Sequence, residues 1–194
     1  GVSFKIEKRE IFGLVGESGS GKSTIGKTIL RLNDKTEGEV KFKGKDVFSL
    51  TTKELRNLRV QTQLVFQDPY SSLNPRIRVG EAIGEAMIEH KLVSKTEVRQ
   101  KVLEVMEKCG LSPYHIDRYP HEFSGGQRQR IVIARAMALN PEFIVMDEPV
   151  ASLDVSIQAQ IINLFSDLQR EKGLSYLFIS HDLSVVEHLC TKIA

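Results

Sequence analysis

The sequence reads Gly16-Glu17-Ser18-Gly19-Ser20-Gly21-Lys22-Ser23 between an apolar run, residues 11–15, and a segment whose pattern predicts a helix over residues 22–32. This stretch fits G-x-x-x-x-G-K-[ST] at every fixed position. Glycines let successive backbone N–H groups turn inward around a phosphate, and the N-terminus of the following helix adds partial positive charge. A chance match is expected in roughly 1% of chains of this length, judged from average residue usage. Because the strand–turn–helix context is also present, the stretch predicts a nucleotide-binding phosphate loop rather than an ordinary glycine-rich turn.

Two side chains of this loop are suited to charge neutralisation and metal ligation. Lys22 places a positive charge beside the β- and γ-phosphates of a nucleotide, and the hydroxyl of Ser23 is short enough to ligate Mg²⁺. The residues expected to contact the nucleotide here are Gly16, Glu17, Ser18, Gly19, Ser20, Gly21, Lys22, Ser23 and Thr24.

A second acidic site follows a buried strand much later in the chain. The apolar run of residues 143–146 ends in Asp147 and Glu148. Ligands of open α/β sheets bind beyond the carboxyl ends of the strands. We therefore expect Asp147 to hold Mg²⁺ and Glu148 to accept a proton from an attacking water. An Asp-Glu pair alone is more often a solvated strand end, but the phosphate loop earlier in the chain favours the functional interpretation.

Short apolar runs alternate with helical patterns along the chain. Strands are expected at residues 11–15, 39–42, 60–66, 143–146 and 176–179, and Val2, Phe4 and Ile6 alternate with polar residues as in a further strand. Besides the helix at 22–32, helices are expected after the Ser94–Glu97 capping box up to Gly110, from Ser124 to about Asn140, and over residues 156–172 with Gly173 as the stop. From Pro69 to about Leu139 the apolar period is helical. The pattern predicts an α/β fold with a mostly parallel sheet, interrupted by an inserted helical subdomain.

Composition narrows the classes of protein. The 194 residues include 27 Lys or Arg and 25 Asp or Glu, which gives a formal net charge of +2. Without a long basic block, a nucleic-acid partner is not favoured. No uninterrupted apolar run exceeds four residues, so no segment of this sequence can span a bilayer.

Cys109 and Cys190 are far apart and are expected to be reduced thiols. The chain opens within a strand-like pattern and stops at Ala194 without a terminating signal, so we expect both ends to be trimmed from a longer protein.

Three further motifs complete a family pattern. Together with the phosphate loop and the acidic pair at Asp147-Glu148, the sequence has Gln67 before Asp68-Pro69, the stretch Ser124-Gly125-Gly126-Gln127, and His181 after an apolar run. In this order the five elements resemble the nucleotide-binding subunit of ATP-binding cassette (ABC) transporters, over essentially the whole chain. The resemblance implies a P-loop NTPase core with antiparallel β elements near the N-terminus. It divides the chain into a RecA-like ATPase core, residues 1–68 and 140–194, and a helical signature subdomain, residues 69–139.

The resemblance also implies roles for individual residues. Two such subunits would dimerise head to tail with ATP between them, so that the partner's nucleotide would be contacted by Ser124, Gly125, Gly126, Gln127 and Asp154. Gln67 would contact Mg²⁺ or the attacking water, and His181 would bond to the γ-phosphate. Catalysis would rest on Lys22, Gln67, His181 and the general base Glu148, with Mg²⁺ held by Ser23, Gln67 and Asp147. Read alone, Gln67 is a polar residue at a strand end, His181 a structural histidine, and Ser124 and Asp154 simple helix N-caps.

A narrower likeness points to one branch of this family. The stretches 66–75, 118–123 and 154–160 look like the dipeptide and oligopeptide importers, specifically their second, F-type ATPase subunit. This implies an ATPase that powers peptide import from the cytoplasmic side of the cell membrane as a peripheral subunit. The implied partners are a second ATPase subunit, two integral membrane permease subunits and, indirectly, a substrate-binding protein. The permease subunits would bind a hydrophobic groove near residues 67–78.

Two alternatives compete with this interpretation. A non-transport ABC ATPase acting on DNA or ribosomes is disfavoured, since only about a hundred residues separate the phosphate loop from Ser124. A GTPase or P-loop kinase is disfavoured because no Asn-Lys-x-Asp base-reading motif is present.

The sequence departs from the family at Ala151-Ser152, where the order is usually reversed, and at Phe123, where the family usually has Leu. The family's adenine-stacking aromatic residue would precede Gly1.

Overall fold

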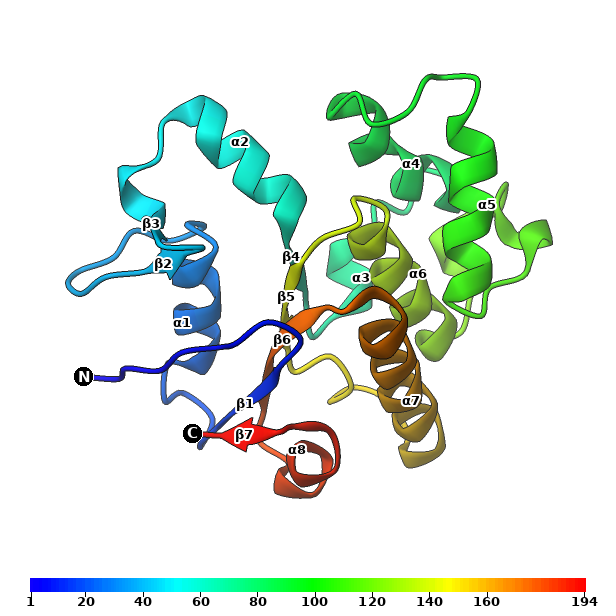
Figure 1. The fold of residues 1–194 in the computed structure, drawn as a ribbon. Coiled ribbons are helices and arrows are strands. Elements are labelled where there is room, and N and C mark those ends of the chain that lie inside the picture. Colours follow the sequence, from blue (N-terminus) through cyan, green and yellow to red (C-terminus); the bar gives the residue numbers. More distant parts are fainter.

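A five-stranded parallel sheet forms the centre of the computed structural model, which describes residues 1–194 (Figure 1). The strands lie in the order β4 (Thr62–Val65), β5 (Phe143–Asp147), β6 (Ser175–Ser180), β1 (Ile11–Val15) and β7 (Lys192–Ile193). Every neighbouring pair runs parallel. The carboxyl ends of β1, β4, β5 and β6 therefore meet at one edge of the sheet. The α/β class with a mostly parallel sheet is confirmed.

Alternate residues of the strands bury on opposite faces of the sheet. On one face Phe12, Leu14, Val145, Leu177 and Ile179 form a small apolar cluster under helix α1 (Lys22–Ile29). On the other face, side chains such as Ile144, Met146, Tyr176 and Phe178 join a core of 32 buried residues. That larger core is covered by α6 (Gly125–Met137), α7 (Val155–Lys172) and α8 (Leu183–Leu189). Burial on both faces explains why these strands are continuous apolar runs in the sequence.

A helical segment leaves the sheet after β4 and returns to it before β5 (Figure 1). It contains α3 (Pro69–Ser72), α4 (Val79–Glu89), α5 (Val98–Lys108), two short 3₁₀ turns at Pro113–His115 and Pro120–Glu122, and α6. Its buried side chains, including Ile83, Met106 and Ile131, belong to the same core as the sheet. The helical insert is therefore as expected, whereas its division from the ATPase core at residues 68 and 139 stays a prediction.

The antiparallel elements near the N-terminus are confirmed in a reduced form. β2 (Lys41–Phe42) pairs antiparallel with β3 (Lys45–Asp46). The turn between them has positive φ at Lys43 (52°) and Gly44 (80°), the backbone that a two-residue hairpin prefers. A 3₁₀ turn at Val47–Ser49 and helix α2 (Thr52–Gln61) follow.

Several expected boundaries differ from the structure. The alternating residues 2–6 pair with no strand; instead the Phe4 ring stacks on Phe12, with 4.9 Å between centroids. The helix after the phosphate loop ends at Ile29, because Arg31 turns to a φ of 51°. Strand β4 begins only at Thr62, because the preceding residues belong to α2.

Helix α2 was missed because its sequence is mostly polar. The signal was a capping box, in which Thr51 Oγ1 accepts from the Glu54 N–H at 3.3 Å and Glu54 accepts from the Thr51 N–H at 3.0 Å. The C-terminal α8 and β7 were missed as well. Other helix signals were correct: Ser94 and Glu97 exchange the two capping-box bonds, and Gly110 and Gly173 end α5 and α7 with φ of 69° and 65°.

Both cysteines are free thiols. Cys109 is fully buried in the larger core, and burial raises the pKa of its thiol to about 12. Burial also raises the pKa of Cys190 to about 12. None of the helices has both the length and the apolar character needed to cross a membrane.

Close packing of α1 on the sheet depends on Gly26. A Cβ there would lie 2.9 Å from Val145 Cγ1 and 3.0 Å from Ile179 Cδ1. On an open helix surface Gly→Ala gains about 1 kcal/mol. At Gly26 we expect the opposite sign, a loss of about 1–3 kcal/mol from overpacking, with Gly26→Val worse than Gly26→Ala. Urea unfolding of the variants measures this, and a rise in unfolding free energy for Gly26→Ala would contradict the packing described.

Candidate nucleotide site

The phosphate loop lies at the carboxyl end of β1 and leads directly into α1. Residues 17–20 are exposed there. Gly21 is the N-cap of α1 with a φ of 94°, a left-handed backbone that favours glycine, and no side chain caps the helix. The first N–H groups of α1 therefore have no side-chain partner and point toward the loop, which makes this end of the helix suitable for an anion.

Lys22 is folded back under the loop. Its side chain is buried, with the residue 6% exposed, and its Nζ donates to the carbonyl oxygens of Gly16 at 2.7 Å and Glu17 at 2.8 Å. A buried ammonium needs such partners, because an unpaired charge away from water is costly. These bonds hold the loop closed around the lysine and keep its positive charge beneath the helix N-terminus.

The loop is joined to the neighbouring acidic strand end by one short hydrogen bond. Ser23 Oγ donates to Asp147 Oδ1 at 2.7 Å. Asp147 is the last residue of β5 and is 7% exposed. A hydroxyl and a carboxylate oxygen side by side are hard ligands of the kind that Mg²⁺ prefers, so these two residues fit a magnesium ion.

Glu148 and His181 form a second pair at the same edge. His181 Nδ1 lies 3.1 Å from Glu148 Oε2. Glu148 has a φ of 48°, and its N–H donates to the Ile179 carbonyl at 2.9 Å, so the chain turns sharply as it leaves β5. The side chain of Glu148 is only 16% exposed, whereas that of His181 is 56% exposed. The carboxylate is thus held at the strand end, and the imidazole borders solvent.

Gln67 reaches this edge from β4. It is exposed, two residues beyond the end of the strand, and its carbonyl lies 3.5 Å from Ser152 Oγ in the loop after β5. The parallel sheet therefore collects six of the expected site residues at one edge, from four strands: Lys22, Ser23, Gln67, Asp147, Glu148 and His181.

The expected residues outside the phosphate loop and this group lie at the N-termini of α6 and α7. Ser124 caps α6: its Oγ accepts from the Gln127 N–H at 3.3 Å, and Gln127 Oε1 accepts from the Ser124 N–H at 3.0 Å. Asp154 caps α7 by accepting from the Ile157 N–H at 3.0 Å. A Cβ on Gly126 would lie 2.5 Å from Ile157 Cγ2, so the two capped helix starts are packed together. No hydrogen bond or ion pair joins Ser124–Gln127 to the phosphate loop of the same chain.

One contributor had no role in the sequence interpretation. The side-chain amide of Gln158 donates to the carbonyls of Val150 at 3.1 Å and Leu153 at 3.0 Å. It thereby fixes the loop between Glu148 and Asp154. A glutamine one turn inside a helix gives no sequence signal for such a contact, because the contact depends on how the loop folds back.

Comparison with known proteins decides the family. A family model described as "ABC transporter" matches residues 1–151. The chain belongs to the ABC transporter family. It is 55% identical over 194 residues to the oligopeptide transport ATP-binding protein OppF of Bacillus subtilis, covering 99% of this chain and 64% of that protein. It is 55% identical to AppF of the same organism, covering 100% of this chain and 59% of the relative.

Other relatives and solved structures agree with this assignment. OppF of Streptococcus mutans is 53% identical over 193 residues, with 99% of this chain and 63% of that protein covered. The chain thus spans about three fifths of the length of the curated relatives it matches. The structure of cbiO1 from Clostridium perfringens, part of the ABC transporter complex cbiONQ, superposes with a TM-score of 0.89 at 26% identity, covering 100% and 75% of the two chains. The ATP-binding cassette MJ0796, a dimer bound to ADP and Pi, gives 0.82 at 33% identity, covering 94% and 79%.

These findings confirm the resemblance to the ABC family and its oligopeptide importer branch, and the ABC-type α/β fold. The individual site residues remain predictions, which the geometry above makes specific.

The capping role of Ser124 can be separated from any role in binding. We expect Ser124→Ala to lower the unfolding free energy by about 1 kcal/mol, because the Gln127 N–H loses its acceptor. Ser124→Asp should cost less, since aspartate caps as well as serine does. Denaturant unfolding in the absence of nucleotide measures both. Equal losses for the two variants would show that the cap contributes nothing.

Proposed function

We propose that this chain is the ATP-hydrolysing subunit of an importer of dipeptides or oligopeptides. The observation that carries the proposal is the grouping of Lys22, Ser23, Asp147, Glu148 and His181 at one sheet edge. The names of the relatives, which are oligopeptide transport and peptide import ATP-binding proteins, support the cargo class. A non-transport ABC ATPase acting on DNA or ribosomes has no such support.

The nucleotide would be ATP, bound by residues 16–24. The N–H groups at the start of α1 would face the phosphates, and Lys22 would exchange its bonds to the Gly16 and Glu17 carbonyls for the β- and γ-phosphates. Ser23, Asp147 and Gln67 would hold Mg²⁺, which supplies neutralisation of phosphate charge. MJ0796, the solved relative, is described as bound to ADP and Pi, which supports the choice of nucleotide.

Glu148 is the proposed general base. Its carboxylate sits at the strand end beside Asp147, so it would accept the proton of a water directed at the γ-phosphate. The contact with His181, at 3.1 Å, would orient this carboxylate, and the exposed part of the imidazole would bond to the γ-phosphate. Gln67, in the adjacent loop, would complete the coordination of the metal or the water.

One chain holds only part of the proposed site. No hydrogen bond or ion pair joins Ser124, Gly125, Gly126, Gln127 or Asp154 to the phosphate loop of the same chain, and we expect them to contact the ATP of a second subunit docked head to tail. The helix N-terminus capped by Ser124 is suited to the γ-phosphate. MJ0796 is described as a dimer, which supports a dimeric assembly. The second subunit would be another copy or a related cassette.

Replacing the proposed base tests the function. We expect Glu148→Gln in the full-length protein to lower ATP turnover by about 10²–10⁴-fold, because the amide cannot accept the proton. ATP binding should be retained, since the side chain has the same shape. A phosphate-release assay beside a nucleotide-binding titration measures both, with Glu107→Gln on the exposed face of α5 as the control. Turnover of Glu148→Gln equal to that of the control would overturn the proposed function.

We assign different proposed roles to the two parts of the chain. Residues 1–68 and 140–194 would hold the nucleotide, and residues 69–139 would couple it to two permease subunits at the cytoplasmic face of the membrane. A permease-associated binding protein would act only indirectly. The groove proposed as the docking surface, of about 450 Å³, lies between α4 and α5 and includes only Ile77 and Arg78 of the stretch 67–78 that the sequence indicated.

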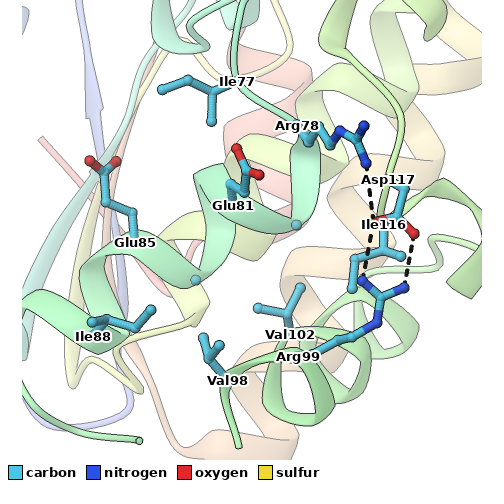
Figure 2. A pocket seen from close by; sticks show the side chains of 12 residues that line it. Ile77, Arg78, Glu81, Glu85, Ile88, Val98, Arg99, Val102, Ile116 and Asp117 are labelled. Atoms are coloured by element: carbon cyan, nitrogen blue, oxygen red, sulfur yellow. Dashed lines mark hydrogen bonds and ion pairs between the residues drawn. The ribbon is translucent and has the colours of Figure 1, made fainter. Parts of the chain in front are cut away.

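Apolar and charged side chains both line the groove, which is shown in Figure 2. Ile77, Ile88 and Val102 supply apolar surface. Glu81 and Glu85 also line the groove, and Asp117 pairs there with Arg99 at 2.9 Å. The Arg99 guanidinium lowers the pKa of Asp117. Such a surface suits a short amphipathic helix of a permease, with its apolar face inward.

Charge reversal in the groove tests the docking. Because Glu81 and Glu85 are exposed, replacing both with Lys should leave the fold intact while weakening recovery of the permease subunits with the full-length protein at least several-fold. Glu107→Lys on α5, outside the groove, is the matched control. Affinity purification of the assembled transporter is the measurement, and equal recovery for the groove and control variants would place the permease elsewhere.

A further inference from the structure

Arg128, in the first turns of α6, is a buried charge without a carboxylate partner. The residue is 8% exposed and takes part in no ion pair. Its Nε donates to the Pro120 carbonyl at 2.7 Å, and its Nη2 donates to the His121 carbonyl at 3.3 Å. On its other side the guanidinium carbon lies 3.9 Å from the centre of the Tyr70 ring. The guanidinium is therefore held between the loop that precedes Ser124 and an aromatic face.

Tyr70 belongs to α3, a helix of only four residues, and is 64% exposed. An exposed tyrosine gains little from hydrophobic burial, so its contact with Arg128 is the interaction that places the ring. A cation over an aromatic face is attracted electrostatically, and the attraction strengthens where water is excluded from the cation. The Tyr70–Arg128 contact is a specific link between α3 and α6.

A second arginine of α6 forms a hydrogen bond at the other end of α3. Arg135 Nη1 donates to the Ser72 carbonyl at 2.5 Å. Arg128 and Arg135 are seven residues apart, which is about two helical turns, and therefore lie on the same face of α6. Helix α3 is thus attached to α6 at its first turn and at its last residue, and Figure 1 shows the two helices side by side.

Short connections extend this attachment to the proposed ATP sites. Asp68 caps α3 by accepting from the Tyr70 N–H at 2.8 Å and the Ser71 N–H at 3.3 Å. Gln67 directly precedes Asp68. At the other end, Ser124 caps α6 and its carbonyl accepts from the Arg128 N–H at 2.9 Å. Gln67 is three residues from Tyr70, and Ser124 is four residues from Arg128.

We propose that Tyr70 and Arg128 are positioning residues that couple the two ATP sites of the dimer through one chain. This inference rests on the proposed function, in which Gln67 serves the chain's own ATP and Ser124 serves the partner's ATP. When Gln67 engages its metal or water, α3 moves, and the stacked Tyr70–Arg128 pair carries α6 and Ser124 with it. Binding of ATP in one site then sets the position of Ser124 in the other.

Substitutions at exposed Tyr70 test this with little risk to folding. The full-length protein carrying Glu148→Gln, with the cassette it pairs with, provides a form that binds ATP without turnover. Tyr70→Leu removes the aromatic face, whereas Tyr70→Phe keeps it and serves as the matched control. Titration of a fluorescent ATP analogue into dilute monomer measures the chain's own site, and light scattering in Mg²⁺-ATP measures dimerisation.

We expect Tyr70→Leu to leave the monomer's ATP affinity within twofold while raising the concentration needed for half-dimerisation about tenfold, with Tyr70→Phe equal to the Glu148→Gln parent. Dimerisation of Tyr70→Leu equal to that of the parent would overturn the coupling role. So would a loss of ATP affinity in the monomer, because Tyr70 would then act on its own site. A parent that neither binds ATP nor dimerises would instead reject the proposed function. Arg128→Lys, which keeps the charge but loses the planar fork, should weaken dimerisation in the same direction as Tyr70→Leu.

Discussion

The hydrogen bond from Ser23 to Asp147 joins two parts of the chain that are 124 residues apart, and the candidate site depends on it. It forms only because β1 and β5 end at the same edge of a parallel sheet, with β6 between them. That register is fixed by strands buried on both faces, where a slip of one residue would exchange the two sets of core side chains. The close packing of α1 on the sheet at Gly26 then places the phosphate loop beside the acidic strand end.

The backbone around this hydrogen bond orients the neighbouring acidic side chains. Glu148 leaves β5 with a φ of 48°, an uncommon backbone for a residue other than glycine, and its N–H is fixed on the Ile179 carbonyl. This turn separates the direction of Glu148 from that of Asp147, so two adjacent carboxylates can have different partners, His181 and Ser23. The amide of Gln158 holds the following loop by its carbonyls, and Asp154 caps the next helix. The acidic strand end is thus rigid without any charge pair to a lysine or arginine.

The helical segment packs against the same sheet. Its core is continuous with that of the strands, while Ser124 at the start of α6 forms its side-chain hydrogen bond with Gln127 and none with the phosphate loop. Contacts between α3 and α6 run through arginines rather than through apolar packing alone, with Arg128 on the Tyr70 ring and Arg135 on the Ser72 carbonyl. Directional contacts of this kind transmit a displacement better than interchangeable apolar ones, because each has one favourable geometry.

The phosphate loop, the acidic strand end and the α/β class could be predicted from local order alone: Gly21 before Lys22, an apolar run before Asp147, and helix stops at Gly110 and Gly173. The prediction was wrong at residues 2–6. Their alternating apolar and polar residues predict a strand, but the segment pairs with no other strand. The prediction missed α2, whose apolar face is too sparse for its periodicity to show. Three contacts could be found only in the folded molecule: Glu148 with His181, Gln158 with the neighbouring loop, and Arg128 with Tyr70. Such contacts join residues distant in sequence through side-chain directions that no periodicity encodes, since the packed sheet and helices set them.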